Sequence, residues 1–271
     1  MSYRTFSLTN GKNQTKTLAD PSTRIFLNNP SGLGLSQTVN VTQFGNVLKS
    51  DSVLQFPTIS GEILFWDDKN SNIYKDYNEF VEFLSYTPLT LSYTIPKPTP
   101  ATYSIDVELT SMEKPQTGQD GAMRCSFNLT GLSRWKGAEV TATGSASSYT
   151  ITNAGQLPVG FSIEINGTDM VNPYITLTQD GNVYGEAKFL DATGFNKVKV
   201  DSNDGNQLVV LEQGGSVLPN PLGYQDLSIS NGAIYVTFVR LARGQSTLAI
   251  GMDSGSIISV TIKHTPLYAS V

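Results

Sequence analysis

Residues 61–91 read GEILFWDDKNSNIYKDYNEFVEFLSYTPLTL, and within them the hydrophobic pattern changes from the period of a strand to the period of a helix. The apolar side chains that share one stripe of this helix are Ile73, Tyr77, Phe80, Val81 and Leu84. Ser71 or Asn72 can cap the first free N–H groups, and Pro88 disfavours helical geometry at the residue before it. The sequence therefore predicts an α-helix at about residues 72–87.

The apolar stripe of the predicted helix must pack on a sheet or on a partner subunit. Burying its apolar stripe is worth roughly 7–15 kcal/mol before opposing terms are counted, so the stripe is not expected to face solvent. Strands are expected at residues 62–66 and 89–95, directly before and after the helix. The helix is expected to pack on these strands, and packing on a partner subunit is the alternative.

Composition favours a β protein that builds its own core. The chain has 271 residues, which is long for one domain and comfortable for two. Charged residues make up only 15%, while Gly, Ser, Thr and Asn are abundant, which suits β-sandwiches whose outer surfaces are partly covered by other subunits. The single cysteine, Cys125, excludes an internal disulfide and fits folding in a reducing cytoplasm.

Charge and hydropathy argue against nucleic-acid and membrane partners. The formal net charge is -5, and Lys and Arg are scattered without a basic stripe, so we expect no nucleic-acid binding. The first residues, MSYRTFSLTNGKNQTK, lack the apolar core of a signal peptide. No window approaches the run of about 18 apolar residues that spans a bilayer, so we expect no membrane anchor.

Residues 37–57 predict a long arm or a loosely paired hairpin. The stretch is polar, and its isolated apolar residues break the alternation of a half-buried strand: Val39, Val41, Phe44, Val47, Leu48, Val53, Leu54 and Phe56. An arm with spaced apolar residues buries them on a neighbouring molecule. An ordinary surface loop is the alternative interpretation.

A change in composition divides the chain. Residues 141–148 are a run of Thr, Ser, Ala and Gly, so we predict a first domain at 1–140, a linker at 141–148 and a second domain at 149–271. The second domain is expected to be an antiparallel sandwich, because short strands alternate with Asn-Gly or Asp-Gly turns at 166–167, 180–181, 204–205 and 231–232. Its expected strands lie near residues 159–165, 174–179, 183–190, 195–200, 207–212, 225–229, 233–241, 246–252 and 256–264.

The sequence offers no catalytic, cofactor or metal site. One histidine, His264, and one cysteine cannot assemble a nucleophilic triad or a zinc site, and an exposed strand histidine is the simpler interpretation. Asp67 and Asp68 are adjacent and are explained by solubility and the helix dipole rather than by glycoside hydrolysis. Residues 201–205, DSNDG, resemble a calcium loop only superficially, and we predict a turn there.

The order and spacing of several segments resemble the distal tail proteins of siphophages that infect Gram-positive bacteria. In the first half these are PSGLGL at 30–35, GEILFW at 61–66, the helix YKDYNEFVEFLS, PLTLSY, YSIDVELTSMEK and CSFNLTGLSRWKG. In the second half they are PYITLTQDGNVYGEAKF, VKVDSNDGNQLVV and YQDLSISNGAIYVTFVRLARGQSTLAIG, which resemble the galectin-like domain of the same family. The resemblance covers nearly the whole chain.

The resemblance implies a mainly β fold, with a β-sandwich or barrel-like first domain that carries one helix and a galectin-like β-sandwich second domain. It also implies a non-enzymatic virion protein at the tail tip, assembled in the host cytoplasm. Members form a six-fold ring that joins the tail tube protein to the tail-associated lysin or tail fibre protein. In some members the second domain holds receptor-binding proteins.

The candidate oligomer interface consists of four apolar residues of the arm and the two tryptophans: Val41, Phe44, Val47, Leu48, Trp66 and Trp135. A closed ring needs a repeated head-to-tail contact, and an arm reaching a neighbour supplies one. The two tryptophans are expected in the core or at the interface. No cofactor is expected.

Three other functions stay open at this point. A host-surface adhesin that binds cell-wall carbohydrate could use the same sandwich, although the second half lacks the tryptophan on which galectins stack sugars. A glycosidase would need two carboxylates across a cleft. A tail-tube protein is a structural rival, which the second domain argues against.

Overall fold

The computed structural model describes residues 4–20, 24–44, 46–66, 73–96, 99–114, 122–190, 193–214, 216–217, 227–229, 232–236 and 240–271. The chain divides into two compact units. The first contains Met1–Gly137 together with Tyr268–Val271, and the second contains Ala138–Leu267. The first unit is therefore completed by residues that follow the second unit along the chain.

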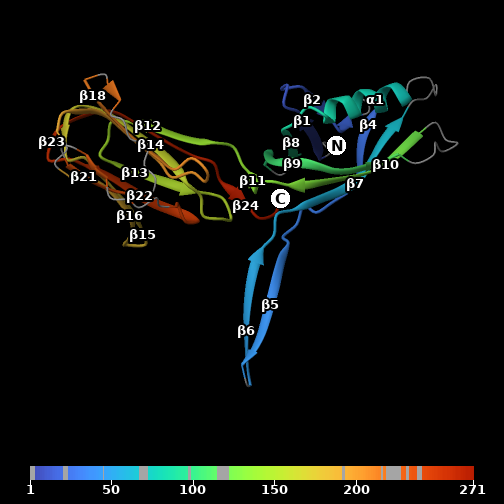
Figure 1. Ribbon diagram of the computed structural model, residues 1–271, viewed down its shortest axis with the longest axis horizontal. Helices are drawn as coiled ribbons and strands as arrows, with labels where there is room; N and C mark the ends of the chain where they lie inside the picture. Colours follow the sequence, from blue (N-terminus) through green and yellow to red (C-terminus); the bar gives the residue numbers. More distant parts are fainter. Residues whose placement is uncertain are drawn as a thin grey trace. The chain divides into compact units, whose positions relative to one another are not determined.

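The first unit is built on one large antiparallel sheet (Figure 1). Its strands follow the order β2-β1-β8-β9-β10-β7-β4-β3, with β11 paired to β9 and β24 paired to β11. Their bounds are β1 Thr5–Thr9, β2 Thr15–Thr17, β3 Ala19–Asp20, β4 Ile25–Ser31, β7 Thr58–Trp66, β8 Leu89–Ile95, β9 Ala101–Glu113, β10 Ala122–Gly131, β11 Trp135–Lys136 and β24 Leu267–Tyr268. The strands expected on either side of the helix are thus both members of this sheet.

The predicted helix is α1, Ile73–Leu84. It packs on the sheet through Phe80, whose ring lies 5.7 Å from the ring of Phe65 on β7 in an edge-to-face arrangement. The buried side chains of α1 are Ile73, Phe80, Phe83 and Leu84. The assignment of Val81 to the buried stripe was wrong, because one residue after Phe80 the helix has turned by about 100° and Phe83 takes that place.

The core of the first unit is a continuous aromatic and aliphatic cluster between α1 and the sheet and along the sheet. Trp135, Phe65, Phe80 and Phe127 are among its largest fully buried side chains. Strand alternation explains the cluster, since on β10 every second residue from Met123 to Leu129 points into it. The residues after the second unit join it as well, because Tyr268 and Val271 pack against this core.

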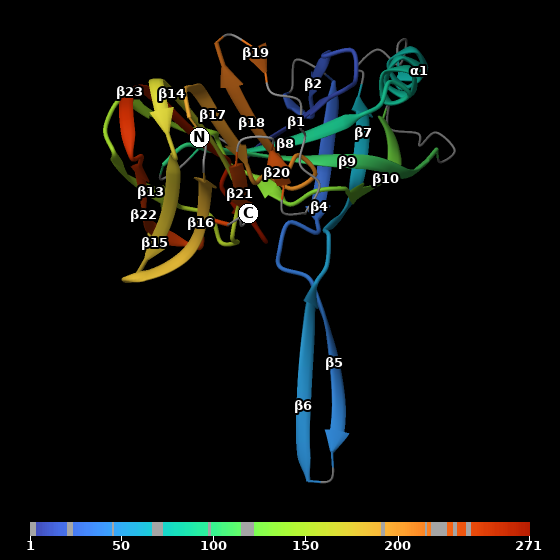
Figure 2. The same ribbon diagram turned by 60° about the vertical axis from the view of Figure 1, so that its left-hand side comes forward.

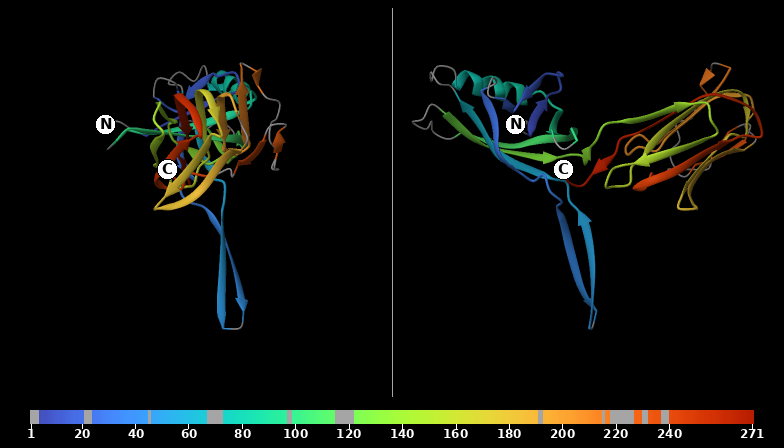
Figure 3. Two further views of the ribbon diagram at one scale, coloured as in Figure 1. Left: turned by 90° about the vertical axis from the view of Figure 1, so that its left-hand side faces the viewer. Right: turned by 180° about the vertical axis from the view of Figure 1, so that it is seen from behind.

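The second unit is a two-sheet antiparallel sandwich around one core (Figure 3). The first sheet has the order β12-β23-β14-β17-β18-β19, and the second has the order β13-β22-β15-β16-β21-β20. Their bounds are β12 Val140–Gly144, β13 Ser148–Asn153, β14 Phe161–Val171, β15 Tyr174–Gln179, β16 Asn182–Leu190, β17 Phe195–Asp201, β18 Leu208–Gln213, β19 Ser216–Val217, β20 Leu227–Ile229, β21 Gly232–Val236, β22 Gly244–Gly251 and β23 Ser254–His264.

This architecture confirms the predicted mainly β fold, and it places the expected linker differently. Residues 141–148 include most of β12, and β12 pairs with β23 inside the second unit. The first half of this run therefore forms an edge strand, for which composition gave no signal, and Ser148 begins β13. Parts of the predicted strands at 225–229 and 233–241 lie outside the described residues.

The predicted turns were right at two places and wrong at one. Asp180 and Gly181 have φ of 49° and 78°, and Gly205 has φ of 75°, as tight turns require. Asn166 and Gly167 instead lie inside β14 at a register shift against β23. A Cβ on Gly167 would stand 2.5 Å from the Ser256 carbonyl oxygen, so this glycine permits close backbone approach rather than a turn. Residue 231 lies outside the described residues.

Candidate oligomer interface

The predicted arm is a long hairpin that projects from the first unit (Figure 2). Strands β5, Gln37–Phe44, and β6, Val47–Leu54, pair antiparallel from Gln37 opposite Leu54 to Phe44 opposite Val47. They form a separate two-stranded sheet. An isolated two-stranded ribbon is marginally stable in water, so this one is expected to gain stability from a partner. The hairpin interpretation is confirmed over the surface-loop alternative.

The two faces of the arm differ in chemistry. Residues directly opposite in an antiparallel pair point to the same face, and alternate residues along a strand share a face. One face therefore carries four apolar residues and no charge, and we call it the apolar face: Val39, Val41, Leu48 and Leu54 with Gln37, Gln43, Ser50 and Ser52. The other face carries Lys49 and Asp51 in its middle.

Side chains of the apolar face are open to solvent in the single chain. Val41 is 59% exposed and Leu48 is 68% exposed. Val47 is 66% exposed, but it pairs with Phe44 on the other face, near the turn. The side chain of Phe44 lies outside the described residues. Of the predicted interface set, the structure thus brings Val41 and Leu48 together on one uncharged surface.

The two tryptophans have opposite surroundings. Trp66 ends β7 and is 47% exposed, so it is open to a partner. Trp135 is fully buried, with its ring 6.5 Å from the ring of Tyr93. Its indole N–H has no hydrogen-bond partner. Trp135 is therefore a core residue and presents nothing to another molecule.

The outer face of α1 adds a second exposed surface. Tyr74 and Val81 are both exposed on it. The Lys114 ammonium lies 4.7 Å from the ring centre of Tyr74 and 4.9 Å from that of Tyr77, which is cation–π geometry. The helix pattern at residues 73–84 gave no sign of these outward aromatic contacts, because Lys114 is distant in sequence.

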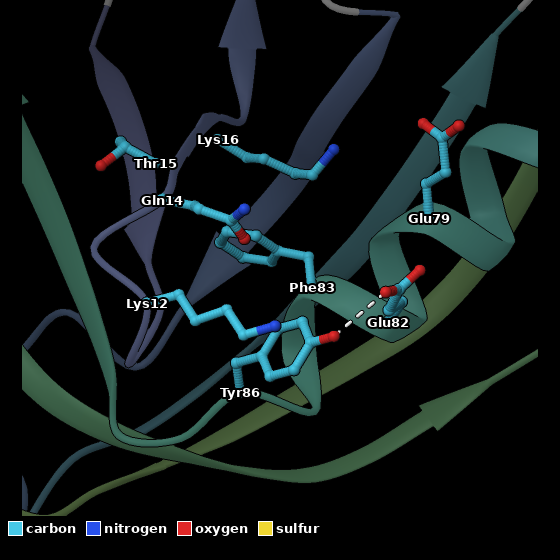
Figure 4. A pocket seen from close by; sticks show the side chains of 8 residues that line it. All are labelled: Lys12, Gln14, Thr15, Lys16, Glu79, Glu82, Phe83 and Tyr86. Atoms are coloured by element: carbon cyan, nitrogen blue, oxygen red, sulfur yellow. Dashed lines mark hydrogen bonds between the residues drawn. The ribbon is translucent and has the colours of Figure 1, made fainter.

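A polar cleft lies between the β1–β2 hairpin and the end of α1 (Figure 4). Its volume is about 380 Å³, and it is lined by Lys12, Gln14, Thr15, Lys16, Glu79, Glu82, Phe83 and Tyr86. The Lys12 ammonium covers the Tyr86 ring at 3.2 Å from its centre, and the Tyr86 hydroxyl donates to Glu82 at 3.0 Å. These contacts already provide partners for the Lys12 ammonium, the Tyr86 hydroxyl and the Glu82 carboxylate. The Lys12–Tyr86 contact joins residues far apart in sequence, so no local motif predicted it.

His264 is buried, which corrects the expectation of an exposed strand histidine. It is 3% exposed at the end of β23, and its Nε2 lies 3.2 Å from the Thr152 carbonyl oxygen. Burial lowers the pKa of this imidazole, while the hydrogen bond to Thr152 opposes the shift. His264 is therefore a core residue of the second unit whose Nε2 has a hydrogen-bond partner.

Cys125 is also buried, on β10 in the first unit. Burial raises the pKa of its thiol to about 11, and the nearby Lys114 opposes this shift. Because the thiolate is the reactive form, the thiol of this cysteine is unreactive in the folded protein. Asp67 and Asp68 lie outside the described residues.

An open polar hollow lies at one end of the second unit. It is lined by Thr178, Gln179, Asp180, Gly181, Arg243, Gly244, Gln245 and Thr247. Gln179 is fixed there, since its amide donates to the Arg243 carbonyl at 2.9 Å and accepts from Ser246 at 3.3 Å. The lining offers hydrogen-bonding groups and no aromatic ring.

The first unit matches a known protein family. Residues 5–132 match the family model described as "Distal tail protein, N-terminal domain". The match runs from the start of β1 to the end of β10 and includes both the arm and α1. A search of curated proteins found no match.

Solved structures share the fold along the whole chain. The SPP1 Dit protein, described as a paradigm of the hub adsorption apparatus in phages that infect Gram-positive bacteria, matches with a TM-score of 0.68 and 14% identity, covering 96% of this chain and 98% of its own. Chains from the phage P2 baseplate in its activated conformation, with Ca or with Sr, match with TM-scores of 0.57 and 0.56, 13% identity and 100% coverage of both chains.

The projecting arm and the helix-covered sheet make up the first unit, which is a distal tail protein N-terminal domain. Residues 5–132 therefore belong to the distal tail protein N-terminal domain family, and the whole chain has the fold of solved phage distal tail and baseplate proteins. In the part of the chain that the structure describes, no helix is long and apolar enough to cross a membrane.

Proposed function

We propose that this protein forms a closed ring of copies at the tail tip. The ring joins the tail tube protein above to the tail-associated lysin or tail fibre protein below. The observation that carries the proposal is the arm, whose apolar face exposes Val41 and Leu48 on a paired ribbon that forms a two-stranded sheet of its own. The family match at residues 5–132 supports the same role.

The arm suits a head-to-tail contact. A projecting element that docks on a different surface of the next copy gives a heterologous contact, and such contacts close into rings when the rotation divides the circle. The occupant of the apolar face is therefore a second copy of this chain. Six copies are the number that the family resemblance implies. Trp66 and the outer face of α1 are two exposed surfaces of the first unit that could receive an arm.

The role is structural, and the proposal assigns no catalytic step to any residue. Surfaces outside the ring contact then serve other virion parts, with receptor-binding proteins held by the second unit. The net charge of -5 favours a passage that does not grip DNA, because like charges repel phosphate over about one Debye length.

The hub role is tested by co-assembly. The full chain is mixed with the tail tube protein and the tail-associated lysin of the same phage, and complexes are separated by size and weighed. The proposal expects each partner to bind the ring at a different face, so that a ternary complex forms. Competition between the two partners for one site, or binding of neither, contradicts the hub.

A carbohydrate-binding role is the second candidate, and the polar hollow of the second unit favours it. Asp180 and Arg243 place a carboxylate and a guanidinium beside Gln179 and Thr247, a set of groups that can hydrogen-bond sugar hydroxyls. Binding of the full chain to host cell-wall polysaccharide, lost on Arg243→Ala, would establish this role. Equal binding by the variant would exclude the hollow as the carbohydrate-binding site.

A further inference from the structure

The arm is fastened to the first unit at both of its ends. Its outgoing end, residues 54–57, begins at the last residue of β6, and its incoming end, residues 32–36, precedes β5. The two ends are joined to each other by one backbone hydrogen bond, from the Gln55 N–H to the Ser36 carbonyl at 2.9 Å. A ribbon held by this bond alone would swing freely, so its direction depends on the contacts below.

Arg134 holds the outgoing end. Its guanidinium donates to the Leu54 carbonyl at 2.8 Å and to the Gln55 carbonyl, and it lies 4.4 Å from the ring centre of Phe56. A planar fork that binds two carbonyls and stacks on a ring is a property of arginine that lysine does not share. The Gly131 N–H adds a hydrogen bond to the Pro57 carbonyl at 2.8 Å.

The loop that carries Arg134 is itself held. The Leu132 N–H donates to the Asp106 carbonyl at 2.7 Å, and the Asp106 N–H donates to the Ser133 hydroxyl at 3.0 Å. Lys136 forms an ion pair with the Asp106 carboxylate. The guanidinium is therefore presented from a loop tied to the middle of the sheet through β9.

Val271 holds the incoming end. Its N–H donates to the Leu33 carbonyl at 3.0 Å, and both side chains pack against the core of the first unit. Next to Leu33, Gly32 has φ of 83°, and a Cβ there would stand 1.8 Å from the Thr58 carbonyl oxygen. The two ends of the arm thus meet in a close approach that only glycine permits.

We propose that Arg134 and Val271 are positioning residues that fasten the two ends of the arm and set the direction in which it meets a second copy. The fastening stands on the contacts within one chain, and the direction-setting rests on the proposed ring. Both residues lie outside the arm in sequence, so the arm's own pattern does not reveal them.

The fastening is tested by hydrogen exchange on the full-length protein at a concentration where it is monomeric. Arg134→Lys keeps the charge and removes the fork, with Arg124→Lys, an exposed residue of β10, as its control. Val271→Pro removes the N–H donor, with Val271→Ala, which keeps it, as its control. Each test variant is expected to speed exchange of the Gln55 N–H on the order of tenfold, as loss of local hydrogen bonds does. Exchange equal to that of the controls overturns the fastening.

The direction-setting is tested with the same variants in an assembly assay. Loss of rings by Arg134→Lys and Val271→Pro, with rings retained by both controls, supports it. Faster exchange with unchanged rings overturns it and leaves the fastening intact. Failure of the unmodified protein to form rings is a failure of the proposed function instead, and the exchange result is independent of it.

Discussion

Removing the apolar face of the arm should dissolve the ring without unfolding the chain. The perturbation is Val41→Ser combined with Leu48→Ser. These side chains are 59% and 68% exposed in the single chain, and full burial of such side chains is worth roughly 1.5–3 kcal/mol each. Docking that buries this exposed part, about two-thirds of each side chain, makes the pair contribute about 2–4 kcal/mol per contact. Association should weaken roughly 30- to 700-fold.

The assay is sedimentation velocity over a concentration series, with thermal unfolding measured in parallel. The matched control is Thr38→Ser with Val53→Ser, a cross-strand pair on the opposite face where Val53 is 51% exposed. The control should weaken association by less than about threefold, and neither variant should change unfolding by more than about 0.5 kcal/mol. Equal weakening by both pairs would refute one-faced docking, and no weakening by either would refute the arm as the contact.

Three further predictions concern single residues. Trp135→Ala should destabilise the first unit by about 3–5 kcal/mol in denaturant unfolding, whereas Trp66→Ala should cost less than about 1 kcal/mol; comparable losses would contradict their assignment to core and surface. The Cys125 thiol, with its pKa raised to about 11, should resist a thiol-specific reagent in the folded protein and react once denaturant unfolds it; rapid reaction of the native chain would be inconsistent with its burial. The lowered pKa of His264 means that the unfolded chain takes up a proton first, so its contribution to stability is complete above pH 6.5 and is lost as the pH falls below it; His264→Gln should flatten that part of the stability curve, and an unchanged curve would exclude this titration.

The large features of the fold could be predicted because they follow from the local spacing of apolar residues along the sequence. The helix at residues 73–84 and most strands of the second unit follow from spacing and turn residues that neighbours in sequence supply. The arm could be predicted for the same reason, since residues 37–57 lack the alternation of a half-buried strand.

The errors came from contacts between distant residues. Gly167 looked like a hairpin turn, but the close approach of Ser256 explains it better. Trp135 could equally have faced a partner, because alternation states which residues share a face and not which face is buried. Arg134 and Val271 carried no sequence signal at all, since each meets the arm from far along the chain.

The central claim is that copies of this chain close into a ring through the arm. Electron microscopy of the purified full-length protein, imaged at rising concentration, tests it most directly. The account predicts closed rings with rotational symmetry in which each arm lies on the neighbouring copy, six copies being the expected number. Two-fold dimers, open filaments, or rings whose arms point into solvent would contradict it.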